Sequence, residues 1–120
     1  MTYDPSNIFA RILRGEIPCR KVYEDEWVLA FHDIQPQAPV HVLVIPKGAY
    51  VSMVDLTARA SEAEIAGLFR AVGTVARELG LEKDGYRILS NCGDHGHQEV
   101  QHLHVHVVGG RSLGRMLAKT

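Results

Sequence analysis

Hydrophobic and polar positions alternate most regularly near the C-terminal end of the chain, where residues 101–108 read Gln-His-Leu-His-Val-His-Val-Val. Alternation is the period of a β-strand, in which every second side chain lies on the same face. The pattern predicts a strand with an apolar row of Leu103, Val105 and Val107 and an imidazole row of His102, His104 and His106. A core has no need of the second row, because a buried imidazole is costly without hydrogen-bond partners. A row of groups that titrate near neutral pH indicates chemistry instead.

The pattern of hydrophobic and polar positions, with helix-capping residues, also predicts the helices and strands in the rest of the chain. The longest helix is predicted from Ser61 to Leu79, because Ser61 and Glu64 form a capping box. Its apolar stripe would consist of Ile65, Leu68, Phe69, Val72 and Leu79. A short helix is predicted at Asn7–Arg14, and further strands at Lys21–Asp25, Trp27–Asp33, Val40–Pro46 and Gly85–Ser90. Five strands that cluster early and late, with two helices, predict an α+β fold with a mainly antiparallel sheet.

Composition narrows the class of protein. The 120 residues suffice for one domain, spanning residues 1–120, and contain no linker or repeat that would divide them. A net charge of −1 gives no electrostatic footprint for nucleic acid, and no stretch is apolar and long enough to span a membrane. Only two cysteines are present, without CxxC spacing, and the N-terminus does not resemble a signal peptide. We therefore expect a cytoplasmic protein.

A zinc site is one interpretation of the histidines. Two same-face imidazoles one residue apart can converge on one ion. Same-face positions lie roughly 6.6 Å apart, however, so His102 and His106 would be separated by about 13 Å along a strand. A single ion could not be reached by all three without bending the strand, so we expect no metal.

Catalysis at phosphorus is the second interpretation. Imidazole is a good nucleophile at neutral pH and can form a covalent intermediate. Phosphoryl or nucleotidyl transfer also needs groups that neutralise charge on the non-bridging oxygens, which neighbouring imidazoles can do. The polar loop Asn91–Glu99 precedes the strand, and its glycines allow backbone N–H groups to approach an anion. The third interpretation, a merely exposed polar face, would rarely place histidine at three successive positions.

These residues resemble the histidine triad family of nucleotide hydrolases and transferases. The family signature alternates three histidines with apolar residues, as His102–Val108 does here. The likeness extends over nearly the whole chain, through Gly15–Pro18, Val22–Asp25, Phe31–Ile34, Ala38–His41, Val44–Lys47 and Gln98–Val100. Gly109-Gly110-Arg111 resembles the branch of histidine triad nucleotide-binding proteins, the purine nucleoside phosphoramidases, and His106 in place of Gln favours a hydrolase over a uridylyltransferase.

The resemblance implies an enzyme that needs no cofactor. It implies hydrolysis of nucleoside phosphoramidates or other AMP or GMP conjugates through a nucleotidyl-histidine. His104 would attack the α-phosphorus, His106 would hydrogen-bond the phosphate, His102 would orient the nucleophile, and His41 would be a fourth histidine in the site. The family also implies a homodimer whose two sheets join into one of ten strands, with the helix Ser61–Leu79 at the interface. Dinucleoside polyphosphate hydrolysis, or nucleotide binding as an adaptor, are the alternatives.

The binding residues are likewise carried over from the family. Asp33 would accept hydrogen bonds from the ribose, while Asn91 and the segment Gln98, Glu99 and Val100 would hold the phosphate and leaving group. An apolar cleft would enclose the purine, formed by Ile8, Phe9, Ile12, Ile17, Phe31 and Leu43, for which core packing is an equally good interpretation.

Four features depart from the better-known members. His97 stands where the family often has Gly, and Glu99 where it often has Ser, so leaving-group preference can differ. The C-terminal tail, residues 114–120, lacks tryptophan, although family tails contact the partner subunit's site. The N-terminal CxxC that binds zinc in some relatives is also missing.

Overall fold

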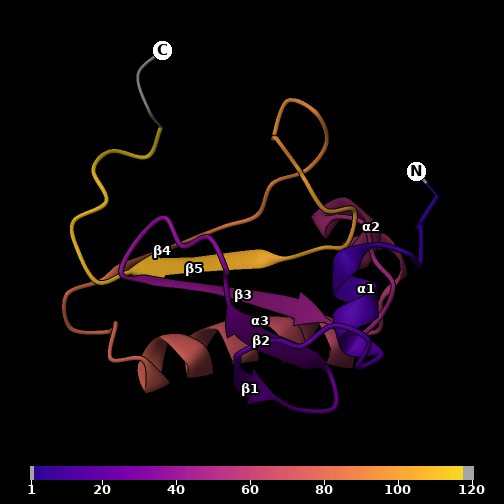
Figure 1. Ribbon diagram of the computed structural model, residues 1–120, viewed down its shortest axis with the longest axis horizontal. Helices are drawn as coiled ribbons and strands as arrows, with labels where there is room; N and C mark the ends of the chain where they lie inside the picture. The colour runs from indigo at the N-terminus through magenta and orange to yellow at the C-terminus, as the bar shows by residue number, and fades with distance from the viewer. Residues whose placement is uncertain (1, 118–120) are drawn as a thin grey trace.

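A five-stranded antiparallel sheet is the centre of the molecule (Figure 1). The computed structural model describes residues 2–117 of the chain, so Met1 and the last three residues of the C-terminal tail lie outside it. Its helices are α1 (Ile8–Leu13), α2 (Met53–Arg59) and α3 (Glu62–Glu78). Its strands are β1 (Lys21–Glu24), β2 (Val28–His32), β3 (Val40–Pro46), β4 (Tyr86–Leu89) and β5 (Val105–Gly109). The strand order is β1-β2-β3-β5-β4, which confirms the α+β prediction.

Local sequence signals explain where the helices begin. Asn7 accepts a hydrogen bond from the backbone N–H of Ala10 and so caps α1. The predicted capping box is present at α3, where Ser61 and Glu64 each accept from the other's backbone. Gly80 follows that helix with a φ of +71°, a conformation that glycine adopts without strain. No helix within residues 2–117 is long and apolar enough to cross a membrane.

The two faces of the sheet carry different kinds of residue. Helix α3 covers one face and packs on an apolar core that includes Val42, Val44, Val105 and Val107. Helix α3 packs closely against Trp27 at Gly67, where an added Cβ would lie 2.7 Å from the Trp27 side chain. The opposite face carries a second cluster, which α1 covers only in part (Figure 1): Phe9, Leu29, Phe31, Leu43 and Ile45.

Cross-strand register fixes what lies side by side on the open face, because paired residues of antiparallel strands point to the same side. One row across four strands contains Phe31, Leu43, His106 and Leu89, each paired with the next. The next row contains His41, Val108 and Arg87. Apolar groups, imidazoles and a guanidinium therefore meet on a rigid surface.

The structure corrects three details of the sequence reading. Helix α2 was not predicted, although Ser52 and Asp55 form a capping pattern there. Strand β5 begins only at Val105, so His102 and His104 precede it rather than lying on a regular strand. Phe69, which the periodicity placed in the apolar stripe of α3, is 45% exposed.

Candidate active site

Two cavities open on the uncovered face of the sheet, and His106 lines both of them. The first has a volume of about 360 Å³ and lies between α1, β2, β3 and the segment before β5. It brings His104 and His106, two of the residues that the sequence reading assigned to catalysis, together with most of those assigned to nucleotide binding: Ile8, Phe9, Ile12, Ile17, Phe31, Leu43, Asp33, Glu99 and Val100. We call it the apolar pocket, because aliphatic and aromatic side chains form most of its wall. Pro18 and Cys19, which the sequence reading did not assign to the site, line it as well.

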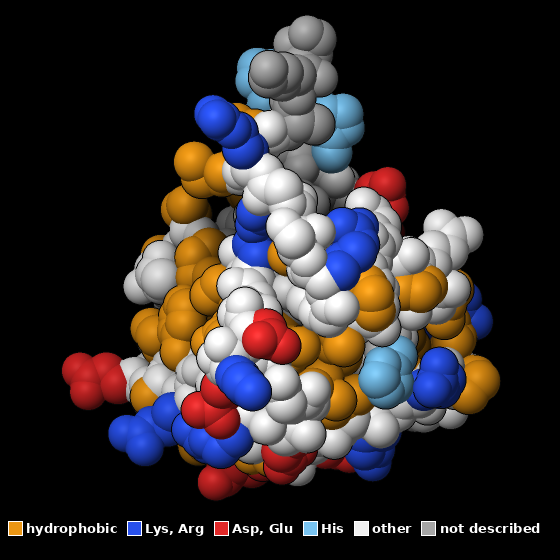
Figure 2. Space-filling model, turned by 90° about the vertical axis from the view of Figure 1, so that its left-hand side faces the viewer, with side chains coloured by type: hydrophobic (Ala, Val, Ile, Leu, Met, Phe, Trp, Pro, Cys, Tyr) orange, Lys and Arg blue, Asp and Glu red, His pale blue; other side chains and the backbone are white. Residues whose placement is uncertain are grey.

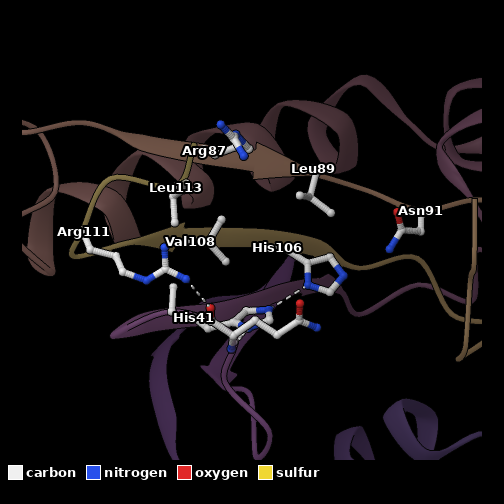
Figure 3. A pocket seen from close by; sticks show the side chains of 10 residues that line it. His41, Arg87, Leu89, Asn91, His106, Val108, Arg111 and Leu113 are labelled. Carbon is white, nitrogen blue, oxygen red and sulfur yellow. Dashed lines mark hydrogen bonds between the residues drawn. The ribbon is translucent and has the colours of Figure 1, made fainter. Parts of the chain in front are cut away.

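The second cavity, of about 290 Å³, lies beyond His106 toward β4 (Figure 3). Two further predicted site residues, His41 and Asn91, line it. It also includes Arg87 and Arg111, so we call it the arginine pocket. Neither arginine was assigned to the site from the sequence. Arg111 follows the quoted Gly109-Gly110 pair, but only the register of β4 against β5 shows that Arg87 lies nearby.

The ring of His104 is oriented by a hydrogen bond to the backbone of a nearby residue. Its Nδ1 lies 2.7 Å from the carbonyl oxygen of His102, so Nδ1–H donates there and the neutral ring carries its lone pair on Nε2. Its ring meets Phe9 edge to face at 4.9 Å and lies 5.0 Å from the ring of His106. The side chain is 6% exposed and lines the apolar pocket. No hydrogen bond to Nε2 is formed by any described residue, so this nitrogen is available for substrate.

His102 lines neither cavity and is completely buried. Its Nε2 lies 2.9 Å from the carbonyl oxygen of Pro46, and its Nδ1 lies 2.6 Å from the hydroxyl of Tyr3. The carbonyl accepts, so Nε2–H donates to Pro46 and Nδ1 accepts from Tyr3. The imidazole therefore anchors the segment before β5, and the backbone carbonyl of the same residue orients His104. Tyr3 was missed because nothing local links it to a residue 99 positions away.

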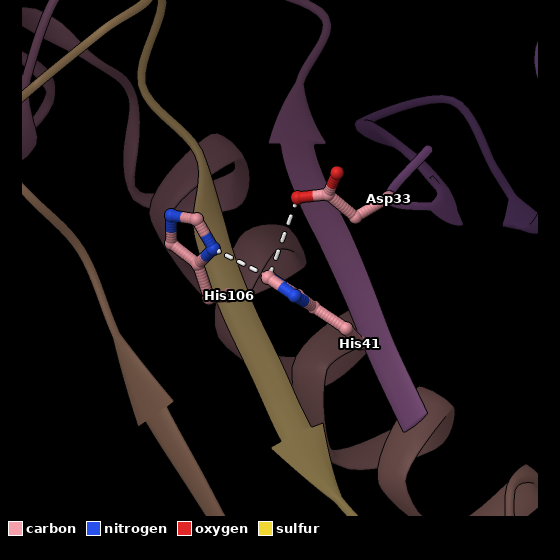
Figure 4. Close-up of side chains that lie close together, drawn as sticks. All are labelled: Asp33, His41 and His106. Carbon is pink, nitrogen blue, oxygen red and sulfur yellow. Dashed lines mark hydrogen bonds and ion pairs between the residues drawn. The ribbon is translucent and has the colours of Figure 1, made fainter. Parts of the chain in front are cut away.

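A chain of hydrogen bonds sets the proton positions of His41 and His106 (Figure 4). The backbone N–H of Gln37 donates to Nδ1 of His41 at 3.0 Å, so the proton of that neutral ring is on Nε2. Nε2 of His41 lies 2.9 Å from Nδ1 of His106 and donates to it. The remaining proton of His106 is therefore on Nε2, which is buried and has no partner among the described residues.

That unpartnered N–H is the kind of donor an anion would satisfy. Figure 3 shows it on the side of the His106 ring that is turned toward Asn91. A buried donor without a partner costs about 1–3 kcal/mol. A phosphate oxygen placed between the two pockets would remove that cost.

Burial keeps the three histidines neutral. Desolvation is the largest effect on each, and it lowers the pKa of His102 to about 4 and the pKa of His106 to about 4. It also lowers the pKa of His104, although the hydrogen bond to His102 and the charges of Asp33 and Glu99 oppose the shift. At pH 7 the rings of His104 and His106 are thus both uncharged.

Asp33 joins the site from the end of β2. Its Oδ1 accepts from the backbone N–H of Gln35, and its Oδ2 lies 3.4 Å from Nε2 of His41 (Figure 4). Asp33, His41 and His106 are the one group among residues 2–117 whose ligand atoms lie close enough to hold a metal ion. Only one member of the triad belongs to it, so the triad does not converge on a common ion.

Hydrogen bonds of the Gln98 side chain fix the loop before β5 in place. This buried side chain donates to the carbonyl oxygens of Val51 and Val100 and accepts from the backbone N–H of Gly93. Its polar atoms are already used, so any phosphate contact here falls to other groups of the loop. Within the same loop, His97 has a φ of +58°, which glycine would adopt with less strain.

Comparison with known proteins identifies the family. The family model of the HIT domain matches residues 14–113. A HIT-like protein of Azospirillum brasilense is 71% identical over 118 residues, covering 98% of this chain and 97% of its own. The purine nucleoside phosphoramidase of Escherichia coli is 44% identical over 111 residues, covering 92% of each chain.

Solved structures give the same result. A histidine triad protein from Clostridium difficile is 41% identical, with a TM-score of 0.85 over 95% of this chain and 98% of that one. A HIT family hydrolase from Legionella pneumophila is 40% identical, with a TM-score of 0.82 over 89% of this chain and 95% of that one. The family model matches most of the chain and the fold agrees with these solved structures, so the chain belongs to the HIT domain family.

Proposed function

We propose that this protein is a hydrolase that cleaves nucleoside phosphoramidates or other AMP or GMP conjugates through a covalent intermediate on His104. The observation that carries the proposal is the state of that ring, with Nδ1–H held by the His102 carbonyl and Nε2 unpartnered in the apolar pocket. The similarity to a purine nucleoside phosphoramidase and to a HIT family hydrolase supports a hydrolase that acts on nucleotides.

The reaction takes two displacements at one phosphorus. The lone pair on Nε2 of His104 forms a bond to the α-phosphorus while the bond to the leaving nitrogen breaks, and that nitrogen takes a proton from solvent and departs as the amine. Water then attacks the same phosphorus and releases a proton to solvent, the bond to His104 breaks with its electron pair returning to Nε2, and the mononucleotide leaves. Neutral imidazole suits both steps, because it is a good nucleophile and, once phosphorylated, a good leaving group.

The other residues position the substrate and share its charge. The purine would lie among the apolar side chains, which include Phe9 and Phe31, and the ribose hydroxyls would donate to Asp33. Nε2–H of His106 would donate to a non-bridging oxygen, with His41 holding the required proton arrangement. A donor fixed in advance for developing charge is worth about 10²–10³ in rate in comparable sites.

The test is turnover of adenosine phosphoramidate by the native chain and by His104→Ala. We expect the variant to bind AMP but to lose at least about a thousandfold in kcat, because the attacking atom is gone. Mass spectrometry of acid-quenched native enzyme should detect one covalently bound AMP, which the variant should lack. His95→Ala is the matched control, since His95 lies in an exposed part of the loop and lines neither pocket.

Two results would contradict the proposal. Full activity of His104→Ala would exclude the covalent mechanism. Binding of AMP without measurable release of AMP from any conjugate would indicate a nucleotide-binding adaptor instead.

We propose that the reaction needs no metal. An ion bound by Asp33, His41 and His106 would have to replace the hydrogen bond between the two imidazoles, which sets the proton on His106. Dialysis against a chelator should therefore leave kcat unchanged. Loss of activity on dialysis, with recovery on addition of zinc, would contradict this.

We also propose a homodimer formed along β4. This strand lies at one edge of the sheet, and Tyr86 and Ile88 on it are 45% and 44% exposed. Exposed apolar residues on an edge strand favour pairing with another chain. Two copies paired there would form a ten-stranded sheet, with the exposed Phe69 of α3 adjoining the interface.

Sedimentation measures the oligomeric state directly. The native chain should be dimeric and Ile88→Asp monomeric, while Val54→Asp, at an exposed apolar position of α2, should remain dimeric. A monomeric native chain would overturn this proposal. A cytoplasmic location is proposed as well, supported by the free thiols of Cys19 and Cys92, and cell fractionation tests it.

A further inference from the structure

The arginine pocket contains positively charged side chains that have no role in the reaction as proposed. Two arginines, Arg87 and Arg111, and two histidines line it, and among residues 2–117 no carboxylate does. The apolar pocket on the other side of His106 is lined by both Asp33 and Glu99. A substrate that spans His106 would therefore meet opposite charge on its two sides.

Both guanidinium groups are fixed in place without being neutralised. Arg87 donates to the carbonyl oxygen of Gly114 at 2.7 Å. Arg111 donates to the carbonyl oxygen of Gln37 at 3.0 Å (Figure 3) and to that of Ser112 at 2.9 Å. Within residues 2–117 neither forms an ion pair with an acidic side chain. Each keeps N–H groups and a full positive charge available to a ligand.

The surface around the pocket is consistent with an approach for a charged group. Figure 2 shows this side of the molecule, where Lys and Arg side chains in the upper part lie among hydrophobic and uncharged surface and most acidic side chains lie lower down. Arg111 is exposed and Arg87 is half-buried, so one guanidinium lies near the mouth and the other deeper. Arginine binds carboxylate and phosphate groups well, because its planar fork matches their oxygens.

The position of the pocket relative to the nucleophile indicates what part of the substrate would enter it. His104 lines only the apolar pocket, whereas His106 and its unpartnered Nε2–H lie at the boundary. In an in-line displacement the leaving group departs on the side away from the nucleophile. With the nucleoside in the apolar pocket, the group that departs from phosphorus faces the arginines.

We propose that the arginine pocket binds the leaving group and selects one that carries an anionic group, a carboxylate or a phosphate, near the scissile bond. Arg87 and Arg111 are its specificity-determining residues. The inference rests on the proposed function, because it assigns the leaving-group side of the same reaction.

Matched conjugates test the selection. The adenosine phosphoramidate of alanine has a free carboxylate, and that of alaninamide differs only in having none. A second pair, the conjugates of 3-aminopropyl phosphate and of 3-aminopropanol, tests phosphate in the same way. We expect the native chain to show about tenfold higher kcat/KM for the anionic member of at least one pair, equivalent to one charge-assisted hydrogen bond. The pair with the larger ratio identifies the source of the anion.

The arginine variants assign the preference to the pocket. Arg87→Gln and Arg111→Gln keep a hydrogen-bonding side chain but remove the charge, and each should lower kcat/KM several-fold more for the anionic conjugate than for its neutral partner. Arg70→Gln, at an exposed position on α3, is the matched control and should keep the native ratio. Hydrolysis of the neutral conjugates reports that the variants are folded.

Three outcomes would overturn the inference. Equal kcat/KM for both members of both pairs would exclude anion selection. A native preference that survives in both arginine variants would place selection elsewhere. If no conjugate is hydrolysed by the native chain, the proposed function fails first and this inference fails with it.

Discussion

The two cavities beside His106 share one sheet face and one histidine, yet they differ in almost everything else. The apolar pocket is lined by aliphatic and aromatic side chains with Asp33 and Glu99, and the arginine pocket by polar groups and two cations. Register contributes to the difference, because the row Phe31, Leu43, His106 and Leu89 is apolar apart from His106, whereas the next row carries His41 and Arg87. A step of two residues along the strands is enough to change the side chains that the face presents.

Removing the shared residue should have the largest effect. We expect His106→Ala to lower kcat/KM about 10²–10³-fold for every conjugate, whatever its leaving group, because the lost donor serves the phosphate. Steady-state kinetics on the neutral and anionic pairs measures this. A loss confined to one class of leaving group would show that His106 serves only one of the two pockets, which would contradict its shared role.

Acid should destabilise the fold through the same buried imidazoles. The pKa of His102 is about 4 in the folded chain against 6.5 ordinarily, so below pH 6.5 the unfolded chain binds a proton that the folded chain does not. Stability should fall as pH drops from 6.5 toward 4, by about 2–3 kcal/mol for this one group. Urea unfolding at pH 7 and pH 4.5 measures the loss, which His102→Gln should reduce and His95→Gln should not. Equal pH dependence in all three chains would show that His102 is not the group responsible.

Substitution of Asp33 tests whether the apolar pocket and the arginine pocket act independently. Asp33→Asn should lower kcat/KM about tenfold for ribonucleoside conjugates, because the charged acceptor for the hydroxyls is lost. Conjugates of the 2′,3′-dideoxynucleoside should be nearly unaffected, and the ratio between anionic and neutral leaving groups should stay unchanged. A change in that ratio would mean that Asp33 acts across His106 on the arginine side.

The contact between Tyr3 and His102 should give the smallest effect. Tyr3→Phe keeps the ring but leaves Nδ1 of a buried histidine without its donor, which costs about 1 kcal/mol of unfolding free energy. A several-fold decrease in kcat with little change in KM should accompany it, because His102 orients His104. Tyr23→Phe, which removes from β1 a hydroxyl that is bonded to Asp25 and lies away from both pockets, is the control for kcat. Unchanged kcat in a destabilised Tyr3→Phe would limit the contact to a structural role.

Local signals made much of the fold predictable from the sequence. The bounds of β3 agree with prediction, as does the capping box of α3, because both depend on residues close together in the chain. Helix α2 was missed because seven residues show too little periodicity, and only its capping pattern marks it. The irregular path at His102 and His104 was missed because alternation alone does not show where a chain leaves the sheet.

Of the two cavities, only the apolar pocket could be anticipated from the sequence. The resemblance to the family named the residues of the apolar pocket, and the structure places those side chains around one cavity. The arginine pocket depends on how β4, β5 and the segment after β5 lie together, which no spacing within the sequence expresses. Gln37 is similar, because its contribution to His41 comes from a backbone N–H that any residue but proline would offer.

The position of α1 has a consequence for anyone who shortens the chain. The family match begins at residue 14, after Ile8, Phe9 and Ile12. A fragment cut at that boundary would keep all five strands and every histidine, and would look complete in an alignment. It would nevertheless lack one wall of the apolar pocket, the ring packed against His104 and the hydroxyl bonded to His102. For this protein the working unit is longer than the recognisable domain.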